Sequence, residues 1–362
     1  MAYEFEVAAD ELFGERYAQM VSTGVPVEDI AAVGATITDM WAGTPGGWVY
    51  EWSQLADRYA RQGDHELAAT AFGWAKFPTI SNEPKRLALA KQVEQYQLAA
   101  PTFDAAFERT VLELPYDGGS TEVPVHLLTP PGIDEDHPVV VYSGGVDTWK
   151  MDMHGLLEII AKITHAPVLA FDLPGTGEST VPMSPDVGAD LTREVLEHAR
   201  ELGNGIVVHF GLSMGGHYSA HTGLAGEADA AVVLGGPIDA AFTASPSHFG
   251  MLGIVANALG YDAEPTEAEI TQQLERFSLR PLLDADTNVP MLVMNGADDV
   301  HVPPHDVLVF QGRRDTEVHL LPDTGHCAIT KLDDVVALFA QWFEKTLPTL
   351  PRKTVTDDRD LR

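Results

Sequence analysis

Short apolar runs recur along the chain beyond residue 105 and predict a β-sheet. They are rich in valine, isoleucine and leucine and occupy residues 108–114, 122–128, 138–143, 167–171, 205–210, 229–234, 290–295 and 317–321. After the third run, stretches with apolar residues three and four positions apart separate them, a spacing typical of helices. Because alternating strands and helices build a parallel sheet, the pattern predicts an α/β fold with about eight mostly parallel strands.

The first part of the chain has the apolar spacing of helices and lacks strand-like runs. This spacing is clearest over 27–33, 48–59, 65–76 and 84–98. We therefore expect an N-terminal helical domain over 1–105, which helps to form a lid, and a core over 106–236 and 284–348. Residues 237–283 are expected to form a helical cap insertion, and 349–362 a flexible, charged tail.

A glycine-flanked serine follows the fifth predicted strand. The segment Gly211-Leu212-Ser213-Met214-Gly215 has the G-x-S-x-G pattern, in which a serine sits on a sharp turn between a strand and a helix. Such a turn strains the backbone and leaves room only for glycine two positions before and after the serine. Ser213 is therefore the candidate nucleophile.

A serine hydroxyl needs a base, and the base needs an acid that orients it. Asp299 follows the seventh predicted strand, and its spacing to Val302 and Pro303 favours it over the adjacent Asp298. His326 follows the last strand, in the segment Asp-Thr-Gly-His. The order Ser213, Asp299, His326 is that of the α/β-hydrolase fold.

Acyl chemistry also needs donors for the oxygen that becomes negative. We expect the backbone N–H of Met214, just after the serine, to be one donor. The second is expected from the loop Ser-Gly-Gly-Val-Asp at 143–147, where Val146 is favoured.

These motifs resemble the FrsA-like branch of the α/β-hydrolases. The resemblance rests on the serine turn, the 143–147 loop, the segments 171–179 and 277–283, and the helical N-terminal region. It implies the α/β-hydrolase fold and an activity among carboxylesterases, a C–C bond hydrolase of 2,6-dihydroxypseudooxynicotine and enzymes that tailor polyketides. In the C–C hydrolases an acidic residue near the oxyanion loop assists catalysis, and Asp147 is the nearest match by position.

The loop after the third strand is also expected to contact the substrate. Gly145, Asp147 and Trp149 are the candidates, although a tryptophan at such a place more often belongs to the core. The pair His217 and His221 has metal-like spacing, but without the glutamate of a zinc motif we interpret it as packing and expect no metal site. Residues 175–180 lack the third glycine of a dinucleotide motif, so no cofactor is expected.

Charge and composition limit the classes of molecule that the protein is expected to bind. The 362 residues carry 22 basic and 54 acidic side chains, a net charge of −32 that disfavours nucleic acid and anionic membranes. The start of the chain lacks a signal-peptide pattern, so a cytoplasmic location is expected. The single cysteine, Cys327, is interpreted as a packing residue beside His326. A small acyl or carbonyl compound is the expected partner, and a homodimer remains open.

Three functions are compatible with these residues. The first is cleavage of a C–O acyl bond in a small secondary-metabolic molecule, by hydrolysis or by elimination of acetate, as in tetronate-tailoring relatives. The second is C–C cleavage of a β-diketone or polyketide, which needs an additional acid or base. The third is a non-catalytic binding protein, disfavoured because Ser213, Asp299 and His326 are all retained.

Overall fold

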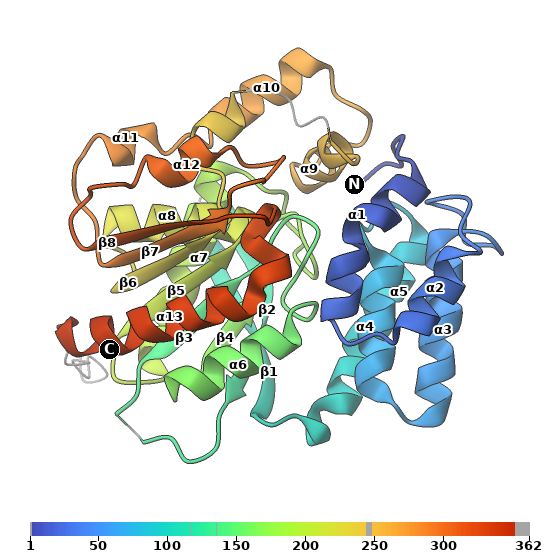
Figure 1. Ribbon diagram of the computed structural model, residues 1–362, viewed down its shortest axis with the longest axis horizontal. Coiled ribbons are helices and arrows are strands. Elements are labelled where there is room, and N and C mark those ends of the chain that lie inside the picture. Colours follow the sequence, from blue (N-terminus) through green and yellow to red (C-terminus); the bar gives the residue numbers. More distant parts are fainter. Residues whose placement is uncertain (1, 117, 135, 244–247, 352–362) are drawn as a thin grey trace.

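Eight strands form one sheet at the centre of the computed structural model, which describes residues 2–116, 118–134, 136–243 and 248–351 (Figure 1). The strands are β1 (Ala106–Tyr116), β2 (Gly119–Thr129), β3 (Val139–Ser143), β4 (Val168–Phe171), β5 (Val207–Leu212), β6 (Ala230–Leu234), β7 (Met291–Gly296) and β8 (Thr316–Leu321). They lie in the order β1-β2-β4-β3-β5-β6-β7-β8. β2 is antiparallel to both of its neighbours, and every other adjacent pair is parallel. The predicted α/β fold is confirmed.

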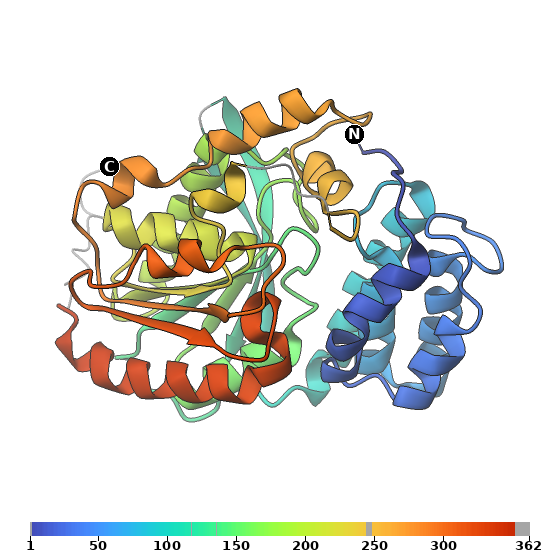
Figure 2. The same cartoon turned by 45° about the horizontal axis from the view of Figure 1, so that its top comes forward.

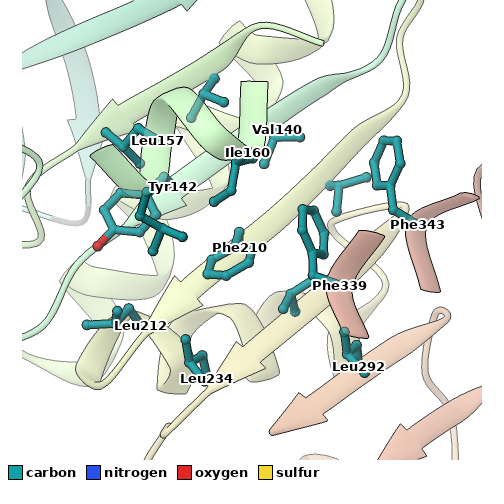
Figure 3. Close-up of a cluster of buried hydrophobic side chains, with 14 of the residues drawn as sticks. Val140, Tyr142, Leu157, Ile160, Phe210, Leu212, Leu234, Leu292, Phe339 and Phe343 are labelled. Atoms are coloured by element: carbon teal, nitrogen blue, oxygen red, sulfur yellow. The ribbon is translucent and has the colours of Figure 1, made fainter. Parts of the chain in front are cut away.

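Helices cover both faces of the sheet because side chains alternate between its faces along each strand. On one face, α6 (His154–Thr164) and α13 (Leu332–Thr346) pack against Val140, Tyr142 and Phe210 (Figure 3). On the other face, α7 (Pro185–Glu201) covers the intervening residues, among them Val139 and Val141, and α8 (Met214–Ala225) lies beside it. The central strands are therefore apolar on both sides, which explains why they read as continuous apolar runs.

Five helices precede the sheet and form a block beside it, coloured blue to cyan in Figures 1 and 2. They are α1 (Ala9–Ser22), α2 (Val27–Gly34), α3 (Trp48–Gln62), α4 (His65–Lys76) and α5 (Glu83–Ala99). Their shared core contains the fully buried Trp48 and Trp52. The short helix η1 (Ala100–Thr102) then leads into β1. α1 is the only one of the five for which the sequence pattern predicted no separate range.

The described part of the segment between β6 and β7 contains four short helices. It contains η2 (Ala240–Phe242), α9 (Met251–Ala258), α10 (Glu267–Glu275) and α11 (Arg280–Leu283). α9 and α10 lie above the sheet in Figure 1. The remaining elements are α12 (Pro304–Leu308), η3 (His326–Lys331) and η4 (Leu347–Thr349). Of the predicted tail, residues 352–362 lie outside the described residues.

A segment ahead of α1 runs alongside α9 in both ribbon views (Figures 1 and 2). The Asn257 side chain of α9 accepts a hydrogen bond from Tyr3 N at 2.8 Å and donates one to Tyr3 O at 3.0 Å. The Phe5 ring lies against the α9 backbone at Gly253, where an added Cβ would come within 2.1 Å of it. These contacts hold the segment against α9.

In the part of the chain that the structure describes, no helix has the length and apolar character needed to cross a membrane.

Candidate active site

Ser213 occupies a strained turn between β5 and α8. Its φ of 55° and ψ of −120° are values that residues with a side chain rarely adopt. A Cβ at Gly211 would lie 2.0 Å from the Gly215 carbonyl oxygen, and one at Gly215 would lie 2.1 Å from the carbonyl oxygen of Ser143. Side chains at either position would collide with the backbone. The predicted strand, sharp turn and helix around Ser213 are therefore present, and the two glycines make the turn feasible.

The structure brings Ser213, His326 and Asp299 together. The Ser213 Oγ lies 2.8 Å from His326 Nε2, and His326 Nδ1 lies 2.7 Å from Asp299 Oδ2. The three residues follow β5, β8 and β7, whose carboxyl ends share one edge of the sheet. Because Asp299 accepts from Nδ1–H, the Nε2 of a neutral His326 is free to accept the hydroxyl proton of Ser213.

Asp299 is fixed by donors on both of its oxygens. Oδ2 accepts from Asn295 Nδ2 at 2.8 Å in addition to His326, and Oδ1 accepts from the backbone N–H groups of His301 and Val302 at 2.7 and 3.1 Å. Burial acts to raise the pKa of Asp299, but these hydrogen bonds and the charge of His326 hold it below its ordinary value. The carboxylate is therefore ionised and immobile.

The neighbouring Asp298 is exposed, and its backbone N–H donates to Thr324 O at 3.0 Å. Of the two adjacent aspartates, Asp299 is the one in contact with the histidine, as the sequence spacing predicts.

The imidazole of His326 is surrounded by groups that favour its charged form. Burial acts to lower the pKa of His326, but the Cys327 sulfur and the Asp299 carboxylate raise it well above its ordinary value. Cys327 itself is buried, and its Sγ donates to Leu234 O at 3.5 Å. The cysteine therefore packs beneath the histidine loop.

Two backbone N–H groups are candidates to receive a negative oxygen at Ser213. Met214 is the first residue of α8, so its N–H has no acceptor within the helix. Val146 lies in the loop after β3, and both residues line the same cavity as Ser213. The adjacent Gly145 N–H is already bonded to Thr148 O at 2.8 Å, which leaves Val146 as the better candidate in this loop.

An apolar cavity with about 630 Å³ of empty space, including its opening, adjoins Ser213 and His326. Its roof comes from the segment between β6 and β7, through Phe242, Met251, Val255, Leu274 and Phe277. The residues that line it come from the core and from this insertion. The N-terminal region contacts α9 of this insertion through Tyr3 and Phe5, and its share in a lid stays a prediction.

The three loop residues predicted to bind substrate hold the loop in place. Gly145 packs against Ser213, where an added Cβ would lie 3.0 Å from the serine Cβ. Asp147 is buried and forms an ion pair with Arg16. Trp149 is buried beneath the Lys76 ammonium group, 3.6 Å from the ring centre. The described wall of the cavity beside Ser213 is built from other residues.

Sequence reasoning missed the part of α1 that approaches this site. Glu15 lies 4.0 Å from His301, and Arg16 contacts Asp147. The only signal was a charged pair within an otherwise amphipathic stretch, which is ordinary for a helix. His301 itself lines the cavity, and burial lowers its pKa to about 4, so it is neutral near pH 7.

His217 is buried, and its Nδ1 lies 3.1 Å from Pro237 O. Burial lowers the pKa of His217 to about 3. Within the described ranges, no cluster of three or more His, Cys, Asp or Glu side chains is arranged to hold a metal ion.

A mostly parallel sheet carrying a serine on a strained turn, with an acid and a histidine after later strands, defines the chain as an α/β-hydrolase enzyme. The family model for Esterase FrsA-like proteins matches residues 35–347. The chain therefore belongs to the Esterase FrsA-like family.

Curated relatives agree with this assignment. Esterase FrsA of Vibrio cholerae is 27% identical over 289 residues, which span 72% of this chain and 67% of that protein. Esterase FrsA of Photobacterium profundum is 23% identical over 307 residues, with 77% of this chain and 72% of that protein covered.

Two solved structures share the fold over nearly the whole chain. AbyA5 superimposes with a TM-score of 0.75 at 20% identity, over 94% of this chain and 98% of its own. The 2,6-dihydroxy-pseudo-oxynicotine hydrolase superimposes with a TM-score of 0.73 at 21% identity and the same coverage. The shared fold therefore includes most of the N-terminal helical region as well as the sheet.

Proposed function

We propose that this enzyme cleaves a C–O acyl bond of a small, largely apolar ester, with Ser213 as the nucleophile. The observation that carries the proposal is the continuous hydrogen-bonded chain from Ser213 Oγ through His326 to Asp299 at the wall of a cavity. This chain supplies a base for the hydroxyl proton and an anion that stabilises the imidazolium.

The reaction proceeds in two steps. His326 Nε2 takes the Ser213 proton as Oγ attacks the acyl carbon, and the oxygen that becomes negative accepts hydrogen bonds from the Val146 and Met214 N–H groups. Return of the proton to the leaving alkoxide frees the alcohol and leaves an acyl group on Ser213. A water molecule, deprotonated by His326, then releases the acid and restores the serine.

The lining of the cavity supports an apolar substrate of moderate size. Phenylalanine, methionine, leucine and valine side chains dominate it, and its polar groups are concentrated at Ser213, His301 and His326. Apolar walls with a few grouped polar atoms suit a ligand that carries one reactive acyl function on a hydrophobic body. A secondary-metabolic ester has this character.

C–C cleavage requires one more acid or base than this chain of residues provides. Asp147 was the candidate by resemblance, but its carboxylate is paired with Arg16 at 2.7 Å and accepts from Thr148 Oγ1 at 3.1 Å. Both oxygens of this carboxylate are therefore already engaged by donors within the protein. Its pairing supports C–O cleavage over the C–C alternative.

Mass spectrometry of the products in ¹⁸O-labelled water tests the proposal. The enzyme is incubated with a panel of O-acetylated alcohols, O-acetylated tetronates and β-diketones. Hydrolysis through an acyl-serine places one ¹⁸O in the released acid and leaves the alcohol unlabelled. Elimination gives an alkene and unlabelled acetate, because both acetate oxygens come from the substrate.

The Ser213→Ala variant serves as the control for spontaneous hydrolysis. Labelled acid that disappears with this variant supports the proposal. Exclusive cleavage of β-diketones would replace it with the C–C alternative, and alkene formation would identify the elimination variant. If none of the substrates were converted, the result would contradict the proposal that this enzyme cleaves small acyl esters.

A further inference from the structure

Helix α1 docks onto the loop that follows β3. Arg16 Nη2 lies 2.7 Å from Asp147 Oδ2, and Gln19 Nε2 donates to Thr148 Oγ1 at 3.2 Å. Arg16 and Gln19 lie three positions apart and so share one face of the helix. The contacts join residues 131 and 129 positions apart in sequence, and Figure 1 shows α1 at the border between the helical block and the sheet.

Arg16 is buried between two carboxylates. Its Nε lies 2.7 Å from Glu15 Oε2, its Nη1 donates to Gln19 Oε1 at 3.2 Å, and its guanidinium lies over the Phe77 ring. The side chain of Arg16 is 9% exposed and that of Asp147 is 8% exposed. Without the guanidinium, the buried Asp147 carboxylate and the partly buried Glu15 carboxylate would have no cation between them, and their repulsion would displace the loop.

A displacement of Asp147 should also displace the Val146 N–H, because hydrogen bonds within the loop restrain its backbone. Gly145 N donates to Thr148 O at 2.8 Å, which closes the loop around Val146 and Asp147. Trp149 Nε1 donates to Val146 O at 3.1 Å and so fixes the far side of that residue. Gly145 in turn packs against Ser213, so the loop cannot move towards the serine to compensate.

The same helical block holds the end of the loop. Lys76 of α4 covers the Trp149 ring and forms an ion pair with Asp152 at 2.5 Å. Asp152 Oδ2 also accepts from Trp149 N at 2.7 Å. Two buried cations of the helical region therefore hold the loop: Arg16 pairs with Asp147, and Lys76 pairs with Asp152.

We propose that Arg16 is a positioning residue for catalysis: through Asp147 it sets the place of the Val146 N–H opposite Ser213. The proposal rests on the proposed function, in which that N–H stabilises the oxyanion. It gives the N-terminal helices a part in the chemical step, although they lie outside the described cavity wall.

The expected effect falls on the transition state. Removing a whole oxyanion donor lowers kcat by about 10²- to 10³-fold, so displacing one donor through Arg16→Met should lower kcat about 10- to 100-fold. The KM for a small ester should change less than about threefold, since ground-state binding does not use this N–H. Asp147→Asn should lower kcat in the same direction, because it removes the charge that Arg16 holds.

The test measures kcat, KM and the binding of phenylboronic acid in Arg16→Met, Asp147→Asn and the double variant, with 4-nitrophenyl acetate as substrate. Boron accepts the Ser213 oxygen as a fourth ligand while the serine proton passes to His326, which gives an anionic tetrahedral adduct. Binding of this adduct should weaken in parallel with kcat. The double variant should lose little more than Arg16→Met alone, since both changes break one interaction.

Arg200→Met is the matched control. Arg200 forms a buried ion pair with Asp229 and donates to Gly205 O, at the opposite end of β5 from Ser213. This variant should lose stability, measured by thermal unfolding, while kcat and boronate binding per folded molecule stay at the wild-type level. A general effect of losing a buried arginine is thereby separated from a positioning effect.

Unchanged kcat and boronate binding in folded Arg16→Met and Asp147→Asn would overturn the inference. Additive losses in the double variant would overturn it as well. If Arg16→Met fails to fold, Asp147→Asn alone decides the question. A wild-type enzyme that neither hydrolyses the ester nor binds the boronate through Ser213 would instead contradict the proposed function.

Discussion

The Ser213 hydroxyl and the His326 imidazole lie 2.8 Å apart, although 113 positions separate them in sequence. The contact exists because β5 and β8 present their carboxyl ends at the same edge of one sheet. We therefore expect the Ser213 hydroxyl to be the nucleophile that attacks an ester.

Replacing Ser213 by alanine should lower kcat for an activated short-chain ester by about three orders of magnitude or more. Among the described residues the hydroxyl makes one hydrogen bond, to His326, so the circular dichroism spectrum and the thermal midpoint should stay close to wild type. Near-normal turnover by a folded Ser213→Ala enzyme would exclude the nucleophile role.

The two adjacent aspartates should differ sharply in a matched pair of variants. Asp299→Asn removes the acceptor for His326 Nδ1–H and favours the wrong tautomer, which lowers kcat by about 10⁴-fold in a comparable triad. Asp298→Asn changes an exposed side chain and should leave kcat within about twofold of wild type. Steady-state kinetics of both variants decide the assignment, and the reverse ranking would move the acid to Asp298.

The rate should rise with pH on an acid limb whose midpoint lies above 6.5, the ordinary pKa of histidine. His326 must be neutral to accept the Ser213 proton, and its pKa in the folded enzyme is raised. His326 is thus protonated and unable to act as a base below that pKa, and it is neutral and able to do so above it. Asp299→Asn should move the midpoint down, because it removes a negative charge that stabilises the imidazolium.

The profile of kcat/KM against pH measures this midpoint. His301 is the control: its pKa is about 4, so His301→Gln should keep a limb above 6.5. A wild-type midpoint near 4 would assign the limb to His301 instead.

Most strands could be predicted from the sequence because they are buried on both faces. Val140 and Val141 face opposite helices, so the run around them is apolar throughout and reads as a strand. The turn at Ser213 could be predicted just as well. Steric conflict at Gly211 and Gly215 restricts both positions to glycine, which leaves a recognisable sequence pattern.

Helix α1 was harder to predict for a physical reason. Its buried face carries Arg16 and Gln19, which interrupt the apolar spacing because they meet Asp147 and Thr148. Asp147 likewise looked available for chemistry, since nothing within a single sequence reveals an ion-pair partner 131 positions away. Contacts between distant polar residues depend on the completed fold.

The enzyme should lose stability steeply as the pH falls from about 6.5 to 4. Burial lowers the pKa of His209 and His217 to about 3 and that of His154 to about 4. Unfolded histidines become protonated below about 6.5 and the buried ones do not, so the unfolded state binds more protons. Each such group then contributes a loss of about 1.4 kcal/mol per pH unit within this window.

Thermal midpoints between pH 7.5 and 4.5 measure the loss. His209→Gln should flatten the dependence, although it also disturbs hydrogen bonds to Ser143 and Thr222. His305→Gln, at an exposed position, should leave the slope unchanged. A flat midpoint across the window would show that these histidines titrate normally.

Filling the cavity should separate substrates by size. Val255 of α9 lines it, and Val255→Trp adds a large ring above Ser213. The ratio of kcat/KM for a bulky aromatic ester to that for an acetate ester should fall at least about tenfold, since the larger substrate loses its space. Steady-state kinetics with the two esters measure this ratio. An unchanged ratio would show that the bulky part of the substrate binds outside this cavity.

The hydrogen bonds between Tyr3 and Asn257 have a practical consequence for anyone producing this enzyme. Any polypeptide fused ahead of Tyr3 is tethered, within a few residues, to the helix α9 that covers the cavity beside Ser213. We expect an affinity tag or fluorescent reporter placed there to displace α9 and so to change which esters enter the cavity. Fusions should therefore be joined beyond α13, whose end lies on the far side of the sheet from α9 in Figure 1.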